Sequence, residues 1–308
     1  MLVRRYIHPL NGYSPATVAE DGSGNLIYTF SRTGSSSSAL TVNYTVAGSA
    51  SLGIDYSGIA ATPASKTLRF AAGAGTAQVI VNPTPDTTSE TNETVLLSLA
   101  PGSGYTIGTA TAVSGTIRND DIIGTDANNT LIGTEEEDYI FGAAGLDRLR
   151  GNGGNDRLAG GAGADTLTGG AGADSFLFQF RQSTLTQTDR ITDFAIGVDR
   201  LDLLSATGAA LPPPTSFSRA GNTAAVTMNG VVASVFTDAN GAAAGNQPLA
   251  ANAAALVRAT APTHAGTYLL INNGVAGFQS GIDLLVNISG NTGSLPALGS
   301  IPIKDWFV

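Results

Sequence analysis

The chain has 308 residues, of which 42% are hydrophobic and 13% are charged, with a formal charge of −9 and no cysteine. This length allows two or three domains with their own cores, and the absence of cysteine excludes disulfides, thiolate metal sites and cysteine nucleophiles. The acidic balance disfavours a nucleic-acid partner, and no apolar run approaches the roughly 20 residues of a membrane-spanning helix.

Residues 1–16, an N-terminal extension in our interpretation, carry basic side chains but no apolar core or cleavage site of an export signal. Three explanations are open at this point. The protein is cytoplasmic, its beginning is missing, or its carboxyl terminus directs export.

Residues 17–122 alternate apolar and polar side chains in short runs such as LIYTF, ALTVNYTV, KTLRF, AQVIV and TVLLSLA. Gly, Pro, Ser and Asp clusters separate the runs at the spacing typical of an antiparallel sandwich. The pattern predicts a β-sandwich, since no amphipathic helical period competes with it.

A period of nine residues begins at Gly124: GTDANNTLI, GTEEEDYIF, GAAGLDRLR, GNGGNDRLA, GGAGADTLT and GGAGADSFL. The first position is always Gly and the eighth is always apolar. The sixth position is occupied by Asn129, Asp138, Asp147, Asp156, Asp165 and Asp174. A flexible glycine-rich linker has no reason to keep this register.

This nonapeptide resembles the calcium-binding repeat of RTX proteins, in which glycines let loops turn tightly and the apolar residue points inward from a short strand. The resemblance implies a parallel β-roll over residues 123–205, including capping strands. In the family, loops 18 residues apart share an ion, which places Asp138, Asp156 and Asp174 on one edge and Asn129, Asp147 and Asp165 on the other. All-oxygen shells suit Ca²⁺, so three or four ions are expected in the roll.

The departures from the repeat fall at its beginning. Asn129 replaces a carboxylate by an amide, and the loop with Glu135, Glu136 and Glu137 lacks two glycines. We therefore expect the first sites to bind calcium more weakly than the later ones, and we expect folding of the whole array to be coupled to the metal.

The sandwich region resembles a Calx-beta domain in VAEDGSGNLIYTFSRTG, LTVNYTVAGSASLGIDYSG, PDTTSETNETVLLSLA and GTIRNDD. The resemblance implies an immunoglobulin-like fold that binds one or two calcium ions with acidic loops at one end. The implied ligands are Glu20, Asp55, Asp86, Glu90, Asp120 and Asp121. Alternatively, these acids are ordinary turn and edge residues, and Glu93 is expected to be a solvated edge charge.

A proline break at 211–214 precedes a tail, residues 215–308, that is predicted to be a small β-rich α+β domain. Asn229-Gly230 and Asn273-Gly274 predict hairpin turns, and AANAAALVRAT predicts a helix. AANAAALV, GTYLLIN, GFQS and DLLVNISG resemble the bluetail-type C-terminal domain of bacterial surface proteins. The expected fold class is thus mostly β: an immunoglobulin-like Calx-beta sandwich, a parallel β-roll and this tail.

Catalytic motifs are missing from the sequence. The two histidines, His8 and His264, have no motif around them, and no nucleophile elbow, zinc helix or phosphate loop is present. We therefore predict a protein that is not an enzyme: a calcium-binding structural or adhesive protein, extracellular or at the cell surface and exported by a C-terminal signal. Its expected partners are calcium and cell-surface or extracellular-matrix components. The alternatives are a fragment of a secreted calcium-dependent hydrolase and a calcium-dependent carbohydrate-binding module.

Overall fold

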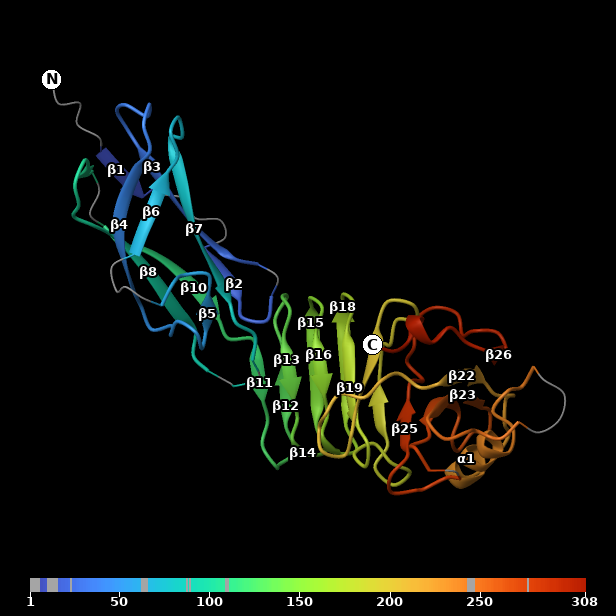
Figure 1. The fold of residues 1–308 in the computed structure, drawn as a ribbon. Helices are drawn as coiled ribbons and strands as arrows, with labels where there is room; N and C mark the ends of the chain where they lie inside the picture. The colour runs from blue at the N-terminus through green and yellow to red at the C-terminus, as the bar shows by residue number, and fades with distance from the viewer. Residues whose placement is uncertain are drawn as a thin grey trace. The chain divides into compact units, whose positions relative to one another are not determined.

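A computed structural model describes residues 6–9, 16–22, 24–61, 66–86, 88, 90–108, 111–242, 247–275 and 277–308. The chain is mostly β, which confirms the predicted fold class (Figure 1). It packs into two compact units, Met1–Asp120 and Asp121–Val308.

The first unit contains two five-stranded sheets, ordered β5-β7-β3-β1-β9 and β2-β10-β8-β4-β6. Their strands are β1 (Tyr6–Pro9), β2 (Thr17–Ala19), β3 (Leu26–Arg32), β4 (Leu40–Ala47), β5 (Tyr56–Ser57), β6 (Lys66–Phe70), β7 (Thr76–Pro83), β8 (Glu93–Ala100), β9 (Thr106–Ile107) and β10 (Val113–Arg118). Most neighbours are antiparallel, and β1–β9 and β2–β10 are parallel.

Apolar residues at alternate positions of the strands form the core of this first unit. In β3, Leu26, Tyr28 and Phe30 are buried while the residues between them are partly exposed, as a strand with one face on the core requires. The hydroxyl of Tyr28 donates to the Val95 carbonyl at 2.6 Å and accepts from the Gly115 amide at 3.1 Å. These bonds tie β3 to β8 and β10, which lie in the other sheet.

The second unit begins with a roll of short parallel strands, drawn side by side in green and yellow in Figure 1. They are β11 (Asp121–Ile123), β12 (Thr130–Ile132), β13 (Tyr139–Phe141), β14 (Ala144–Gly145), β15 (Arg148–Gly153), β16 (Arg157–Ala159), β17 (Ala162–Gly163), β18 (Thr166–Ala171), β19 (Ser175–Gln179), β20 (Asp189–Ile191) and β21 (Arg200–Leu204). Strands one full coil apart pair in register, for example Leu149 with Leu167.

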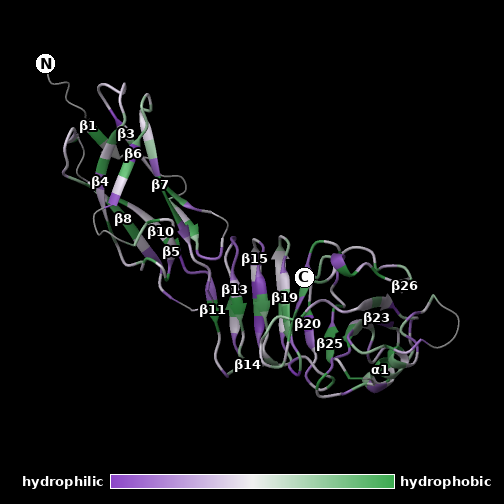
Figure 2. Cartoon of the chain, viewed as in Figure 1, coloured by the Kyte–Doolittle hydropathy of each residue, from purple (hydrophilic) through white to green (hydrophobic). Residues whose placement is uncertain are grey.

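The eighth position of the nonapeptide supplies the core of the roll. Ile140, Leu149, Leu158, Leu167 and Phe176 are at most 1% exposed and belong to one cluster. Figure 2 shows hydrophobic and hydrophilic residues following one another along these strands. Each coil alone buries too little apolar surface to fold, and stacking makes the core continuous.

The C-terminal strands extend one sheet of the roll. That sheet has nine strands in the order β12-β15-β18-β20-β25-β24-β23-β22-β26. Its later members are β22 (Ser216–Arg219), β23 (Ala253–Ala259), β24 (Gly266–Ile271), β25 (Leu284–Asn287) and β26 (Gly299–Ser300). Helix α1 (Met228–Thr237) and the 3-10 helix η1 (Ile303–Asp305) complete the unit.

The hairpin predicted at Asn229-Gly230 is wrong, because this segment forms α1. The Thr227 hydroxyl caps the helix by accepting from the Gly230 amide at 3.1 Å, and such caps favour helix initiation. Val231 and Val235 then share one buried helix face. The turn predicted at Asn273-Gly274 lies instead in the longer loop between β24 and β25.

The helix predicted in AANAAALVRAT is also wrong, because Ala253–Ala259 is strand β23. Alternate residues face two different cores: Ala255 and Val257 pack in the cluster with α1, whereas Ala254 and Leu256 pack in the roll cluster. A strand buried on both faces shows no polar alternation, and its alanines then resemble a helix. Among the described residues no helix is long and apolar enough to cross a membrane.

Candidate metal centre

The sixth-position side chains form two ladders along the edges of the roll. Each carboxylate accepts, through Oδ1, the backbone N–H of the sixth residue 18 positions earlier. The donors and acceptors are Asn129 to Asp147 at 2.7 Å, Asp138 to Asp156 at 3.0 Å, Asp147 to Asp165 at 2.9 Å and Asp156 to Asp174 at 3.0 Å. The structure thus brings the predicted residues together in the two sets of three that the 18-residue spacing implied.

The first-position glycines make room for these carboxylates. A Cβ on Gly133 would lie 2.6 Å from Oδ2 of Asp138 and 2.6 Å from the Gly151 carbonyl oxygen of the next coil on that edge. A Cβ on Gly142 would lie 2.6 Å from Oδ2 of Asp147. All three distances are shorter than van der Waals contact. The loop therefore needs glycine at its first position to bring the carboxylate and a backbone carbonyl close together.

The second oxygens of the central carboxylates lack protein partners. Oδ2 of Asp147, Asp156 and Asp165 is buried and accepts no hydrogen bond from the described residues. A buried carboxylate is costly unless a cation or donors compensate it. Carboxylate oxygens beside loop carbonyls match the all-oxygen shell of calcium, so the residues present fit this ion.

The raised pKa values of the ladder carboxylates also fit the binding of a cation. Burial, together with the nearby charges of Asp174 and Asp138, raises the pKa of Asp156 to about 7 despite the lowering effect of a backbone hydrogen bond. Burial likewise raises the pKa of Asp174 to about 6 and the pKa of Asp165 in the same direction. The protein alone therefore stabilises these carboxylates poorly as anions, and a divalent cation would compensate them.

The first two loops are built differently. The Thr134 amide and hydroxyl donate to Oδ2 of Asp138 at 2.6 and 3.1 Å, and the Thr125 amide donates to Oδ1 of Asn129 at 2.6 Å. At the same position of the next two loops, Ala143 and Asn152 have φ values of 75° and 84°. Threonine thus donates to a side-chain oxygen in the first two loops, whereas Oδ2 of Asp147 and Asp156 in the next two loops accepts no such bond from the described residues.

Both ladders continue beyond the sixth repeat. The Asp165 amide donates to Oδ1 of Asp189 at 2.9 Å, and the Asp174 amide donates to Oδ1 of Asp199 at 3.1 Å. The separations grow to 24 and 25 residues because longer loops precede β20 and β21. Burial raises the pKa of Asp189 to about 8. The nine-residue register cannot reveal these two coils, although Asp-Arg before an apolar residue marks both.

A second carboxylate cluster lies in the first unit. Oxygens of Asp55, Glu90 and Glu93 lie within 4.8 Å of one another, an arrangement that could hold a metal ion. Burial, a hydrogen bond with Asp55 and its charge raise the pKa of Glu93 to about 7. Glu93 was expected to be a solvated edge charge, and its position next to Asp55 corrects that expectation. No local signal marks it, because only the packing of β8 brings it to this loop.

The other acids implied by the Calx-beta resemblance lie apart from this cluster or in different surroundings. Asp86 is only partly buried and accepts from the Thr88 amide at 2.7 Å. Glu20 and Asp120 are 3% and 5% exposed, and Oδ2 of Asp120 accepts from the Asp21 amide at 3.2 Å. Asp121 begins β11 and therefore belongs to the second unit.

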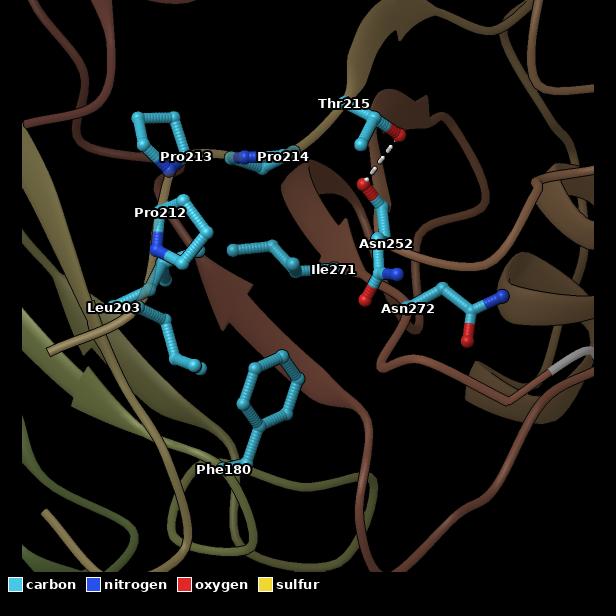
Figure 3. A pocket seen from close by; sticks show the side chains of 10 residues that line it. Phe180, Leu203, Pro212, Pro213, Pro214, Thr215, Asn252, Ile271 and Asn272 are labelled. Atoms are coloured by element: carbon cyan, nitrogen blue, oxygen red, sulfur yellow. Dashed lines mark hydrogen bonds between the residues drawn. The ribbon is translucent and has the colours of Figure 1, made fainter. Parts of the chain in front are cut away.

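An apolar pocket of about 180 Å³ lies elsewhere in the second unit. Figure 3 shows the ring of Phe180 and the side chains of Leu203 and Ile271 beside three consecutive prolines. Its polar lining consists of Thr215, which donates to the Asn252 carbonyl at 2.9 Å, and of the amides Asn252 and Asn272. The lining offers hydrophobic contact and amide groups without an ionisable side chain.

Residues 114–149 and 142–176 match the family model of the RTX calcium-binding nonapeptide repeat. This part of the chain is an RTX calcium-binding array. None of the curated proteins compared with the chain matches it.

Solved structures similar to the chain are of two kinds. The AlgE6R2 subunit of the Azotobacter vinelandii mannuronan C5-epimerase is 31% identical over 55% of this chain and 84% of its own, with a TM-score of 0.33. The AlgE6R3 subunit of the same enzyme is 24% identical over 58% and 88%, with a TM-score of 0.32. The apo-form Calx CBD1 domain is 23% identical over 38% and 99%, with a TM-score of 0.31.

Proposed function

We propose that this protein is a secreted or cell-surface structural or adhesive protein whose roll folds when it meets calcium outside the cell. The observation that carries the proposal is the buried, unpartnered Oδ2 of Asp147, Asp156 and Asp165. The ion-free roll must hold these oxygens without compensation, whereas the calcium-bound roll turns them into ligands.

Calcium outside the cell would then act as the folding signal. Sites with dissociation constants of roughly 10⁻⁴ to 10⁻³ M stay empty in the cytosol and fill in extracellular fluids. Glycine-rich loops lose much conformational entropy on ordering, and the eighth-position apolar residue of each nonapeptide offsets only part of that loss. Coupling folding to the ion would keep the chain unfolded before export and would order it afterwards.

We assign three or four ions to the roll, held by the carboxylates of the two ladders with loop carbonyls. The central coils would bind most tightly, since the first loops use Thr125 and Thr134 as internal donors. In the first unit, Asp55, Glu90 and Glu93 would hold one or two further ions. Export through a C-terminal signal and an adhesive partner at a cell surface or in extracellular matrix complete the proposal.

Fluorescence of Trp306 tests the calcium-folding step. Trp306 is the single tryptophan of the chain, is 1% exposed and belongs to the core cluster of the roll. In EDTA we expect a red-shifted emission together with a weaker far-ultraviolet circular dichroism signal, and calcium should restore both. Unchanged spectra and an unchanged melting temperature in EDTA would contradict the proposal. Calorimetric titration would count the ions, with three or four expected for the second unit.

A further inference from the structure

One face of the nine-stranded sheet is covered over only half of its width. At the C-terminal half, Val257 of β23 and Tyr268 of β24 pack in the same cluster as Val231 and Val235 of α1. At the other half, β12, β15, β18 and β20 turn their second set of side chains outward, because Leu149 and its counterparts occupy the core. We call this uncovered half the open face.

Register fixes the composition of the open face. Thr130, Arg148, Thr166 and Arg190 lie side by side in one row across the four strands, and Ile132, Arg150 and Thr168 form a second row. The three arginines are exposed. A shallow groove of about 220 Å³ runs over β12, β15 and β18, with Arg148 and Arg150 in its lining.

The guanidinium groups of the open face are available to a ligand. Within the ranges that the structure describes, Arg148, Arg150 and Arg190 make no hydrogen bond and no ion pair through their side chains. Arginines of the opposite sheet do have partners. Arg157 lies over the ring of Tyr139, with 5.6 Å from its guanidinium carbon to the ring centroid, and Arg200 donates to three backbone carbonyls.

We infer that the open face binds an extended acidic polysaccharide whose repeating anion is a carboxylate. The planar guanidinium fork matches a carboxylate with two parallel hydrogen bonds, and threonine hydroxyls between the arginines suit sugar hydroxyls. Arg148 and Arg190 stand two strands apart, about 9 to 10 Å at the usual strand spacing. A flat sheet with regularly spaced cations and hydroxyls fits a ribbon-like polymer that carries carboxylates at intervals.

The charge of the protein favours an acidic polysaccharide over nucleic acid as the ligand of the open face. The whole chain carries −9 and three arginines form the face, so a densely charged phosphate backbone would meet too few cations. A uronic-acid polymer has fewer charges per unit length and many hydroxyls. Binding would use arginine and not calcium, and it would place the protein on an acidic coat or matrix. The inference rests on the proposed function only in that calcium must fold the roll.

The test uses the full chain and short galacturonic acid oligosaccharides at a fixed free calcium concentration that gives the folded Trp306 spectrum. Isothermal calorimetry should show binding that weakens as salt is raised. Methyl-esterified oligosaccharides of the same length should not bind measurably. Arg148→Gln combined with Arg150→Gln should weaken binding by about tenfold or more, since two charged donors to the carboxylates are lost.

Arg157→Gln is the matched control, because Arg148 and Arg157 occupy the same position of consecutive nonapeptides on opposite sheets. It should leave binding within about twofold of the wild type, inside the usual scatter of surface substitutions. Equal loss in both variants, or equal binding of the esterified sugar, would overturn the inference.

Two further outcomes separate this inference from the proposed function. If the protein shows the folded Trp306 spectrum but does not bind the acidic oligosaccharide, only the inference is overturned. If such a protein instead binds vesicles with anionic lipid, and this binding depends on Arg148, the ligand of the open face is a membrane surface. A roll that stays unfolded in calcium overturns both.

Discussion

At the scale of single residues, the partners of an acid decide its role in this protein. The carboxylates of Asp86 and Asp156 are chemically identical, yet Asp86 is partly open to solvent and accepts from the Thr88 amide, whereas Asp156 is 1% exposed with one oxygen unpartnered. Only the second arrangement gains from a cation, because a solvated carboxylate gives up its water when it binds a metal.

Asp156→Asn should weaken the response of the roll to calcium. The amide oxygen can still accept the Asp138 N–H, but the anionic ligand is lost, so we expect the calcium midpoint of the Trp306 spectrum to rise by about tenfold or more. In EDTA the spectra of the variant and the wild type should coincide, because both rolls lack the ion that couples to folding. Asp238→Asn, which retains the acceptor for the Asn240 amide, should change neither midpoint nor stability. A D156N midpoint equal to the wild type would argue against this ligand.

Glu93→Gln tests the cluster of the first unit. Because Glu93 lies among Asp55 and Glu90, removing its charge should raise the melting temperature of the ion-free sandwich by a few degrees and reduce the further rise that calcium produces. Differential scanning calorimetry with and without calcium measures both shifts. Asp86→Asn should leave both unchanged. Should D86N weaken the calcium effect more than E93Q does, the ligand set drawn from the Calx-beta resemblance would be the better one.

At the scale of elements, the nine-residue repeat, half of one coil, is the unit of the roll, and its eighth-position side chain forms the inner contact. Leu158 of β16 is fully buried between Ile140 and Phe176, its partners on either side in the sheet. Both sheet partners belong to neighbouring coils, so the stability of each coil depends on the next one.

Leu158→Ala should destabilise the calcium-bound second unit by about 2 to 5 kcal/mol, the usual cost of truncating a buried leucine. Denaturant unfolding followed by Trp306 fluorescence measures the change in unfolding free energy. Ile132→Ala is the control in the same kind of strand, since Ile132 is 58% exposed, and its effect should stay within about 0.5 kcal/mol. Equal losses in the two variants would mean that the eighth position does not form the core.

At the scale of the whole molecule, the chain divides into two compact units, and each has its own hydrophobic cluster. The sandwich closes its core with strands from far apart in the sequence. The roll instead depends on stacking and on its loops, and its sheet continues into β25, β24 and β23, whose other face packs on α1. The C-terminal strands therefore cap the end of the roll that would otherwise expose its core.

Calorimetric heating should reveal two transitions, because units with separate cores unfold as separate cooperative blocks. Calcium should raise the transition of the second unit strongly, by mass action on several sites, and should raise that of the sandwich less. Asp156→Asn should shift only the transition reported by Trp306. A single transition that moves as a whole with calcium would show that the two units unfold together.

The sequence by itself determined the mostly β fold, the register of the roll and the two sets of aspartates 18 residues apart. It could do so because a nine-residue period forces every coil into the same geometry, so the position in the repeat predicts the position in space. The departure of the first two loops from the repeat was equally readable at Asn129 and in the Glu-rich loop, and their weaker calcium binding stays a prediction.

Only the tertiary structure decided the remaining features, which rest on contacts between distant segments. It turned MNGVVASVF into a helix and AAALVRA into a strand, because β23 is buried on both faces and so loses the pattern that marks a strand. It also brought Glu93 to Asp55, extended the ladders to Asp189 and Asp199, and left three arginines together on the open face. These features depend on how distant strands pack, so only the packed chain could place them.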